Sequence, residues 1–340
     1  MCDAGTLKEH DTALCGSHCF TCLPQNEFVL IRVIRVLFSA LRFNVATQKI
    51  IEMFRIEKIS SFDSPELQPY ATMKRPLEHE RQGIFVAEGV KVVRRLLESH
   101  FAVASVVLPE KWLETFRPLI EARPEQITVY LAEKKFLEGL VGFSMFQGVL
   151  AVGKIPLPIS LDDILQKSPP PRLFVAVDAL TNAENLGALV RNCVAFGVQA
   201  LIVGETSSSP FLRRAVRNSM GTIFQLPVIE VGTARCAVRS SQRDDPTHHS
   251  LSQTLRDLRA HGLRCIAAHP HTDQRILSQA DFSNDCCIVF GSEGDGISVS
   301  VLEACDEAVA IPMPPAVDSL NVGAAAAVFL YETSRQRGRA

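Results

Sequence analysis

The stretch Ile311-Pro312-Met313-Pro314-Pro315-Ala316-Val317-Asp318-Ser319-Leu320-Asn321-Val322 decides the fold of this chain. Its apolar beginning predicts the end of a strand at 308–313, its prolines predict a stiff loop, and the residues after them predict a helix at 319–335. Ser319 is a candidate N-terminal cap of that helix. In an α/β sheet, ligands bind beyond the carboxyl ends of the strands, so a loop of this kind is a candidate binding element.

Two more loops follow predicted strands in the same way. The segment Asp178-Ala-Leu-Thr-Asn-Ala-Glu-Asn185-Leu-Gly187-Ala-Leu-Val-Arg191 runs from a strand end into a helix that carries an arginine on its second turn. The segment Phe290-Gly291-Ser292-Glu293-Gly294-Asp295-Gly296 contains three glycines, which let the backbone approach a ligand closely. Three unusual loops at strand ends therefore predict one shared site.

Each loop alone also has a simple structural explanation. Arg191 could be a solvated helix residue, the glycines could form a tight turn, and Ser319 could only cap a helix. The glycine order Gly-x-x-Gly-x-Gly does not fit the dinucleotide-binding fingerprint, and no ribose-binding acid follows at the right distance. This argues against a nucleotide-binding oxidoreductase, which titration with S-adenosylmethionine against NAD would test.

Strands and helices alternate regularly around these loops. Strands are predicted at 173–178, 200–204, 226–230, 263–268, 286–291 and 308–313, and helices at 184–196, 210–220, 252–261, 299–304 and 319–335. This alternation predicts a mostly parallel sheet covered on both faces. Upstream, a smaller α/β domain is predicted, with strands at 103–108, 127–130 and 147–152 and helices at 89–99 and 112–121. The predicted organisation is an N-terminal extension at 1–55, a small domain at 56–155, a proline-containing linker at 156–171 and the larger domain at 172–340, with a polar loop or surface insertion at 232–250.

The composition is that of an ordinary globular protein, with 47% hydrophobic and 21% charged residues in 340. The 35 basic and 37 acidic residues give a net charge of −2, so nucleic acid would have to be bound through local basic patches. Six of the ten cysteines are scattered through apolar segments of the body, which does not fit a secreted disulfide framework. We therefore expect a cytoplasmic protein.

No membrane segment is predicted. The longest apolar run near the start, 28–41, carries Arg32 and Arg35 and is shorter than the roughly 20 residues that a spanning helix needs. The first 31 residues contain no arginine and several acidic residues, which argues against a transit peptide or a secretory signal.

The N-terminal extension contains Cys15, Cys19, Cys22 and His18, which could bind zinc. Cys19 and Cys22 form a Cys-x-x-Cys half-site, but no second half-site follows at the expected spacing. The alternative is a poorly ordered segment that leads into one helix.

Together, the three loops resemble the SpoU (TrmH) branch of the SPOUT methyltransferases. Its three motifs, Asn-x-Gly-x-x-x-Arg, Gly-x-Glu-Gly and Ile-Pro-Met followed by Ser-Leu-Asn, appear here at 185–191, 291–294, 311–313 and 319–321. The match covers 172–335. The preceding domain is similar to the family's substrate-binding domain through Phe85-Val-Ala-Glu88-Gly89 and Gln147-Gly148-Val149-Leu150-Ala151-Val152.

The resemblance implies RNA ribose 2'-O-methylation with S-adenosylmethionine as methyl donor, without a metal. It also implies an α/β SPOUT domain with a trefoil knot near the carboxyl end, after a small α/β substrate-binding domain. Such proteins work as homodimers with the final helix at the interface. The small-residue segment 323–327 is compatible with that role and with core packing.

The resemblance also implies roles for individual residues. Arg191 is assigned the central catalytic role, with Asn185 and Glu293 orienting it and Ser319 and Asn321 lining the pocket. The donor is expected to contact residues of the second and third motifs, namely Gly291, Gly294, Ile311, Met313 and Leu320. Because a guanidinium is a very weak acid, Arg191 either removes the hydroxyl proton with help from an RNA phosphate or binds that phosphate and stabilises alkoxide charge.

RNA contact is predicted for three arginines of one helix, Arg213, Arg214 and Arg217. Relatives act on rRNA or tRNA, often at guanosine, and the sequence does not identify the RNA. The alternative is a catalytically inactive RNA-binding or ribosome-assembly protein of the same fold, which the intact motif residues argue against.

Overall fold

The computed structural model describes residues 54–61, 63–73, 75–141, 147–232, 250–272 and 275–338. These residues belong to one compact unit, Glu52–Ala340. The cysteine cluster at 15–22 and most of the predicted insertion at 232–250 lie outside the described residues. None of the described helices is long and apolar enough to cross a membrane.

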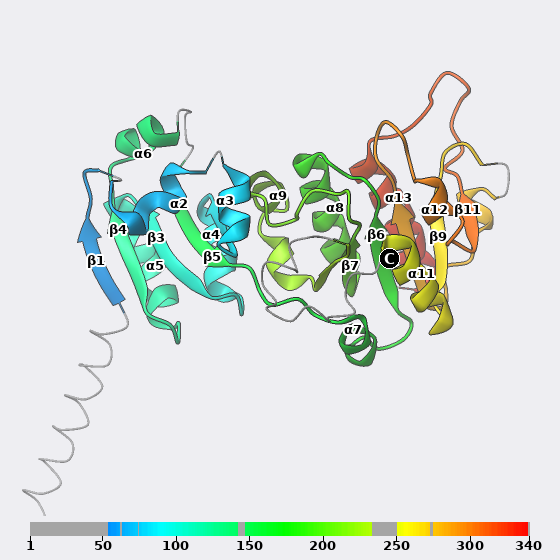
Figure 1. Ribbon diagram of the computed structural model, residues 1–340, viewed down its shortest axis with the longest axis horizontal. Helices are drawn as coiled ribbons and strands as arrows, with labels where there is room; N and C mark the ends of the chain where they lie inside the picture. Colours follow the sequence, from blue (N-terminus) through cyan, green and yellow to red (C-terminus); the bar gives the residue numbers. More distant parts are fainter. Residues whose placement is uncertain are drawn as a thin grey trace, which may run out of the picture. The chain divides into compact units, whose positions relative to one another are not determined.

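The first sheet has five strands in the order β1-β4-β3-β5-β2 (Figure 1). β1 and β3 run parallel to β4, whereas β5 runs antiparallel to both β3 and β2. Its strands are β1 (Phe54–Lys58), β2 (Ile84–Glu88), β3 (Val103–Leu108), β4 (Ile127–Leu131) and β5 (Leu150–Lys154). The helices of this part are α2 (Gln68–Ala71), α3 (Pro76–Arg81), α4 (Val90–Glu98), α5 (Leu113–Glu121) and α6 (Lys134–Val141).

Several boundaries of this part differ from the predictions. The buried strand predicted at 147–152 begins only at Leu150, because Gly148 has a positive φ of 70° that breaks the extended backbone before it. Strands β1 and β2 were not among the predicted strands. β1 begins at Phe54, within the predicted extension.

The second sheet has six parallel strands in the order β11-β9-β10-β6-β7-β8, as predicted for a mostly parallel sheet. Its strands are β6 (Leu173–Val177), β7 (Ala200–Val203), β8 (Val228–Glu230), β9 (Arg264–Ala268), β10 (Cys286–Phe290) and β11 (Glu307–Val309). The helices are α7 (Leu161–Lys167), α8 (Ala183–Ala195), α9 (Arg213–Asn218), α11 (Leu251–Ala260), α12 (Val299–Leu302) and α13 (Val322–Gln336).

Both faces of this sheet are buried. Side chains alternate along each strand, so Val175 of β6 packs with α8 and α13, whereas its neighbour Phe174 packs with α7 and α11. Burial of both faces explains why these strands are almost entirely apolar. Figure 1 shows α8 and α13 beside one another, and both pack over the same face.

The end of the second sheet differs from the prediction in two places. The strand predicted at 308–313 ends at Val309, because Pro312 and the prolines after it lack the N–H groups that a ladder needs. The helix predicted from Ser319 begins at Val322, because the side chain of Asn321 accepts the hydrogen bond of the Gly323 N–H and caps the helix. The third motif therefore lies almost entirely in a loop.

The helix predicted at 210–220 is also shorter than expected. It begins at Arg213, after Leu212 in an extended conformation, and ends at Asn218, just before Gly221 takes a left-handed conformation.

Candidate active site

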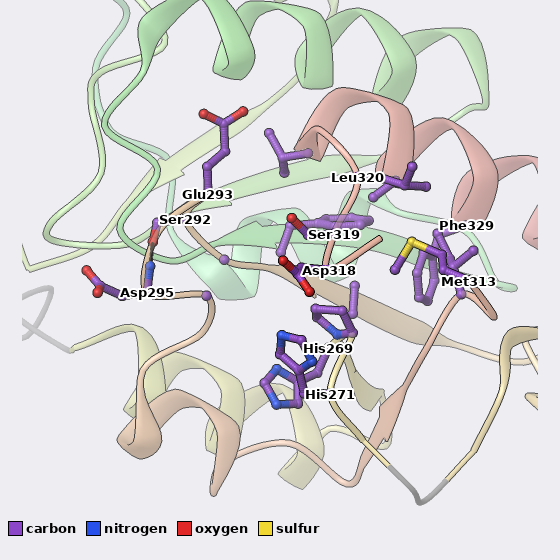
Figure 2. Close-up of a pocket in the computed structure, with 18 of the residues that line it drawn as sticks. His269, His271, Ser292, Glu293, Asp295, Met313, Asp318, Ser319, Leu320 and Phe329 are labelled. Carbon is purple, nitrogen blue, oxygen red and sulfur yellow. Dashed lines mark hydrogen bonds between the residues drawn. The ribbon is translucent and has the colours of Figure 1, made fainter. Parts of the chain in front are cut away.

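A cavity of about 410 Å³ lies at the carboxyl ends of β9, β10 and β11 (Figure 2). The loop after β10 contributes Gly291, Glu293 and Gly294 to its lining. The loop after β11 contributes Ile311, Met313, Ser319 and Leu320. All the residues predicted to contact a donor therefore line one cavity, together with the catalytic candidates Glu293 and Ser319.

The bottom of the cavity is aromatic. Phe290 at the end of β10 and Phe329 of α13 are almost fully buried, and their rings pack edge to face with centroids 5.7 Å apart. This geometry is favoured between aromatic rings and fixes α13 against the end of the strand. The cavity therefore has a rigid apolar base.

The glycine loop after β10 folds back on itself. The Ser292 N–H donates to the Gly296 carbonyl at 2.9 Å, and the Asp295 N–H donates to the Ser292 hydroxyl at 3.1 Å. A Cβ atom at Gly291 would overlap the backbone of Gly296 and of Ile297, whereas one at Gly294 would meet nothing within 4 Å. Gly291 is thus required by close backbone packing.

A buried carboxylate holds the end of this loop. Asp178, which follows β6 and is 4% exposed, accepts a hydrogen bond from the Ser298 N–H at 2.7 Å. Such a charge-assisted bond from a backbone donor is stronger than a neutral one. The first motif region thereby fixes the position of the second.

Three predicted catalytic residues meet beside the cavity. The side-chain amide of Asn185 donates to Oε1 of Glu293 at 2.5 Å, and that of Asn321 donates to the same oxygen at 2.8 Å. The Asn321 amide also lies 3.1 Å from the Asn185 side-chain oxygen, to which it donates. One residue from each of the three motifs therefore joins a single polar network.

Asn185 is placed by the first turn of α8. The side chain of Asn182 caps this helix by accepting hydrogen bonds from the N–H groups of Glu184 and Asn185, at 2.8 and 3.2 Å. Further along, the Asn192 amide donates to the Gly323 carbonyl at 2.6 Å and joins α8 to the start of α13. The helices that carry Asn185 and Asn321 are thus fixed to one another.

Arg191 does not join this network. It is exposed on α8, six residues after Asn185, which at 3.6 residues per turn directs it to another side of the helix. Within the described residues, no hydrogen bond or ion pair joins Arg191 to a residue of the cavity. The structure brings Asn185, Glu293 and Asn321 together and places Ser319 in the lining of the cavity, and the role of Arg191 stays a prediction.

The three predicted RNA-binding arginines of α9 differ in their surroundings. Arg213 and Arg217 both form ion pairs with Glu88 of β2, the latter at 2.9 Å, and Glu88 is 7% exposed. Arg214 is exposed. Arg213 thus helps to join α9 to the first sheet, a role that the sequence pattern did not indicate.

The loop after β9 also contributes to the cavity, which the sequence pattern did not indicate. His269 and His271 of this loop line the cavity, and so does Asp318 of the third motif region. The sequence does contain a signal for this loop, because His269 follows a predicted strand at the same sheet edge as the other loops. A single histidine after a strand is too common a pattern to indicate a binding site.

This chain is similar to several known proteins. The model of the SpoU rRNA Methylase family matches residues 172–247 and 244–331. A Mycobacterium tuberculosis protein named as an uncharacterized tRNA/rRNA methyltransferase is 30% identical over 292 residues, which are 82% of this chain and 92% of that protein. The 23S rRNA (guanosine-2'-O-)-methyltransferase RlmB of Vibrio vulnificus is 29% identical over 255 residues, 73% of this chain and 96% of the relative.

A solved structure extends the comparison to the fold. The AdoMet-bound rRNA methyltransferase from Sinorhizobium meliloti aligns with a TM-score of 0.66 at 20% identity, over 82% of this chain and 98% of that one. The family match, together with the parallel sheet and its three strand-end loops, defines a methyltransferase of the SPOUT class. This chain belongs to the SpoU rRNA methylase family.

Proposed function

We propose that this protein transfers the methyl group of S-adenosylmethionine to a ribose 2'-hydroxyl of rRNA or tRNA, at guanosine. The observation that carries the proposal is the network of Asn185, Glu293 and Asn321 at the rim of a cavity built from the glycine loop and the proline loop. Membership of a methylase family and the guanosine 2'-O-methyltransferase among its relatives support the same reaction.

The cavity fits a methyl donor of this kind. Its volume of about 410 Å³ lies in the range of small-molecule sites, and its lining combines an apolar base with several polar side chains. The missing side chain at Gly291 lets the backbone of Gly296 pack against it, which closes the glycine loop that lines the cavity. Bound S-adenosylmethionine would supply a methyl group activated by its attachment to a sulfonium.

The chain's own residues then have distinct tasks. The reaction requires oxygen, methyl and sulfur in line, so rigid positioning of the pocket wall matters most. Glu293 is held by two amide donors, which fixes its carboxylate at the rim, and Ser319 lines the same cavity. In our proposal Arg191 binds the RNA phosphate and stabilises negative charge on the attacking oxygen, or removes its proton with phosphate assistance.

No cysteine is proposed to take part in the chemistry. Burial raises the pKa of the Cys286 thiol to about 11 and that of Cys305 to about 12, so both stay protonated near neutral pH. A protonated thiol is a poor nucleophile. We therefore propose that the methyl group passes directly from the donor to the ribose, without a covalent intermediate on a cysteine.

RNA contact in this proposal uses Arg214 and Arg217. Arg214 is exposed, and the side chain of Arg217 is 53% exposed despite its ion pair with Glu88. Arg213 is only 15% exposed, so we propose that it acts mainly through Glu88. The small domain, 56–155, would bind RNA beside these residues, and 156–171 would connect it to the methyltransferase domain, 172–340.

We also propose a homodimer with α13 at its interface and a trefoil knot around the donor pocket. Val328 and Tyr331 lie three residues apart on α13, on one side of the helix, and are 40% and 54% exposed. An exposed apolar pair on a helix whose other side is buried suits a second copy of the chain. A reducing, RNA-containing compartment such as the cytoplasm suits the free thiols among the described residues.

The test begins with total RNA from cells that lack the protein. Incubation with purified protein and labelled S-adenosylmethionine should add 2'-O-methyl groups at one site, which mapping would identify. Arg191→Ala should abolish transfer and leave donor affinity nearly unchanged, whereas Arg256→Ala, an exposed arginine of α11, should do neither. Donor binding without transfer to any RNA would favour an inactive RNA-binding protein, and full turnover by Arg191→Ala would refute its role.

A further inference from the structure

A second cavity, of about 400 Å³, lies where the end of α9 meets the first sheet. The turn from β2 to α4 forms one wall, the residues just before β5 form another, and Arg217 and Met220 form a third. This cavity shares no lining residue with the cavity at the ends of β9, β10 and β11. Its volume lies in the range of small-molecule sites, so it is a separate candidate site.

The walls of the second cavity are fixed to one another. Arg217 of α9 donates to Oε1 of Glu88 at 2.9 Å, at the end of β2. Arg95 of α4 donates to the Met220 carbonyl at 2.8 Å, which joins α4 to the chain after α9. The cavity is therefore held by contacts on both sides.

The lining of the second cavity has surplus positive charge. Glu88 contributes a carboxylate, but this group is already paired with Arg213 and Arg217. Lys91 is exposed and forms no ion pair with another described residue. The side chain of Arg217 is 53% exposed, and a guanidinium has five N–H donors, so donors are left for a ligand. These cations favour an anionic group such as a phosphate.

Other lining residues suit a flat aromatic ring with polar edges. Val90 and Met220 are half-buried and apolar. The side-chain oxygen of Gln147 accepts the Val90 N–H at 3.4 Å, and its amide nitrogen has no hydrogen-bond partner among the described residues. A nucleobase can pack its face on apolar side chains and accept a hydrogen bond at its edge.

Close packing of α8 on α9 connects this cavity with the reaction site. A Cβ atom at Gly187 of α8 would overlap the backbone of Ala215 of α9, so the glycine of the first motif lets the two helices approach closely. α8 carries Asn185 of the polar network, and α9 carries Arg217 of the second cavity. One RNA bound across these two helices would therefore contact both sites.

We propose that the second cavity binds one unstacked nucleotide of the substrate RNA, away from the ribose that is methylated, an inference that rests on the proposed function. Lys91 and Arg217 bind its phosphate, and Gln147 donates to the edge of its base. Proteins recognise RNA sequence mainly at such unpaired, splayed-out bases. The second cavity thus contributes to the choice of RNA, whereas the first cavity holds the methyl donor.

A cavity-filling variant tests whether a base enters. Val90→Phe adds bulk at the half-buried first residue of α4 without a change of charge. The probes are a short fluorescein-labelled single-stranded RNA of mixed sequence and a blunt RNA duplex of the same length, and fluorescence anisotropy measures their affinity for the full chain. Val90→Phe should weaken binding of the single strand about tenfold and leave duplex binding within about twofold, because paired bases stay stacked.

Lys91→Ala and Arg94→Ala form a matched pair. Both remove an exposed cation from α4, but only Lys91 lines the cavity. Lys91→Ala should weaken binding of the single strand about threefold or more, whereas Arg94→Ala should leave it within about twofold. Each variant should bind S-adenosylhomocysteine as the wild type does. This comparison decides the matter if Val90→Phe does not fold.

The possible results are distinct. If the wild type transfers a methyl group to no RNA, the proposed function itself fails. If the wild type is active but does not bind the single strand, or if Arg94→Ala weakens that binding as much as Lys91→Ala, only this inference is overturned. Unchanged binding of the single strand by folded Val90→Phe has the same meaning. Tight binding of a free nucleoside 5'-monophosphate that Val90→Phe abolishes would indicate a small-molecule site instead and would also overturn it.

Discussion

Asn321 links the capping of helix α13 to the position of Glu293. Its side-chain oxygen accepts the Gly323 N–H at 2.9 Å, and its side-chain amide donates to Glu293 at 2.8 Å. The same residue thus ends the third loop, starts the final helix and fixes a carboxylate of the second loop. The stability of the helix and the geometry of the site are therefore coupled. A comparison of Asn321→Ala with Asn321→Ser separates the two effects.

Replacement of Asn321 by alanine is expected to lower both stability and activity. Loss of the cap should cost about 1 kcal/mol, and loss of the amide leaves Glu293 with one donor from the network. Asn321→Ser keeps a capping oxygen without the amide, so its thermal midpoint should stay close to that of the wild type while methyl transfer falls as in the alanine variant. Full activity of the serine variant would show that the bond to Glu293 is dispensable.

Gly291→Ala is expected to disrupt the glycine loop. Its Cβ would overlap the backbone of Gly296, and forced overpacking of this kind costs roughly 1–3 kcal/mol. Affinity for S-adenosylhomocysteine should fall about tenfold or more, as measured by calorimetry. Gly139→Ala, on α6 and outside the cavity, is the matched control, because its Cβ meets nothing within 4 Å. Equal effects of the two substitutions would contradict the close-packing argument.

Glu88→Gln is expected to weaken the attachment of α9 to the first sheet. The change leaves Arg213 and Arg217 without their shared carboxylate, which is buried, and breaking such a pair costs roughly 3 kcal/mol. The midpoint of denaturant unfolding should drop clearly. Glu98→Gln removes an exposed partner of Arg94 at 3.8 Å, and it should change stability by less than about 1 kcal/mol.

His79 is expected to make stability depend on pH. Burial lowers its pKa below the ordinary value of 6.5, because the charged ring is disfavoured there. Its Nε2 atom lies 3.0 Å from the Thr72 hydroxyl, with which it forms a hydrogen bond. Between the folded pKa and 6.5 the unfolded chain binds more protons, so the free energy of unfolding falls as pH decreases through this window.

Urea unfolding at pH 7.5 and 5.5 measures this effect. His79→Gln should lose part of the pH dependence, whereas His100→Gln, at an exposed position, should keep it. An unchanged dependence in His79→Gln would show that other groups cause it.

The loops that carry the candidate site could be predicted from local sequence. Apolar runs followed by glycine, asparagine or proline indicate where buried strands end, and the ends of β6 and β10 fell within one residue of the prediction. The resemblance of three short motifs indicated the family. Element limits in the third loop were predicted less well, because Ile311 is apolar like a strand residue although the prolines after it prevent pairing.

The sequence by itself determined which loops carry the site, because strand ends and helix starts depend on neighbouring residues. Only the tertiary structure decided that Asn185 and Asn321, 136 residues apart, share one oxygen of Glu293, that Arg213 pairs with Glu88, and that Nδ1 of His269 is buried. These relationships depend on the order and register of parallel strands, such as Phe290 beside Val177, and on how helices pack across the sheet. Such pairings form between residues distant in the chain, so no local pattern encodes them.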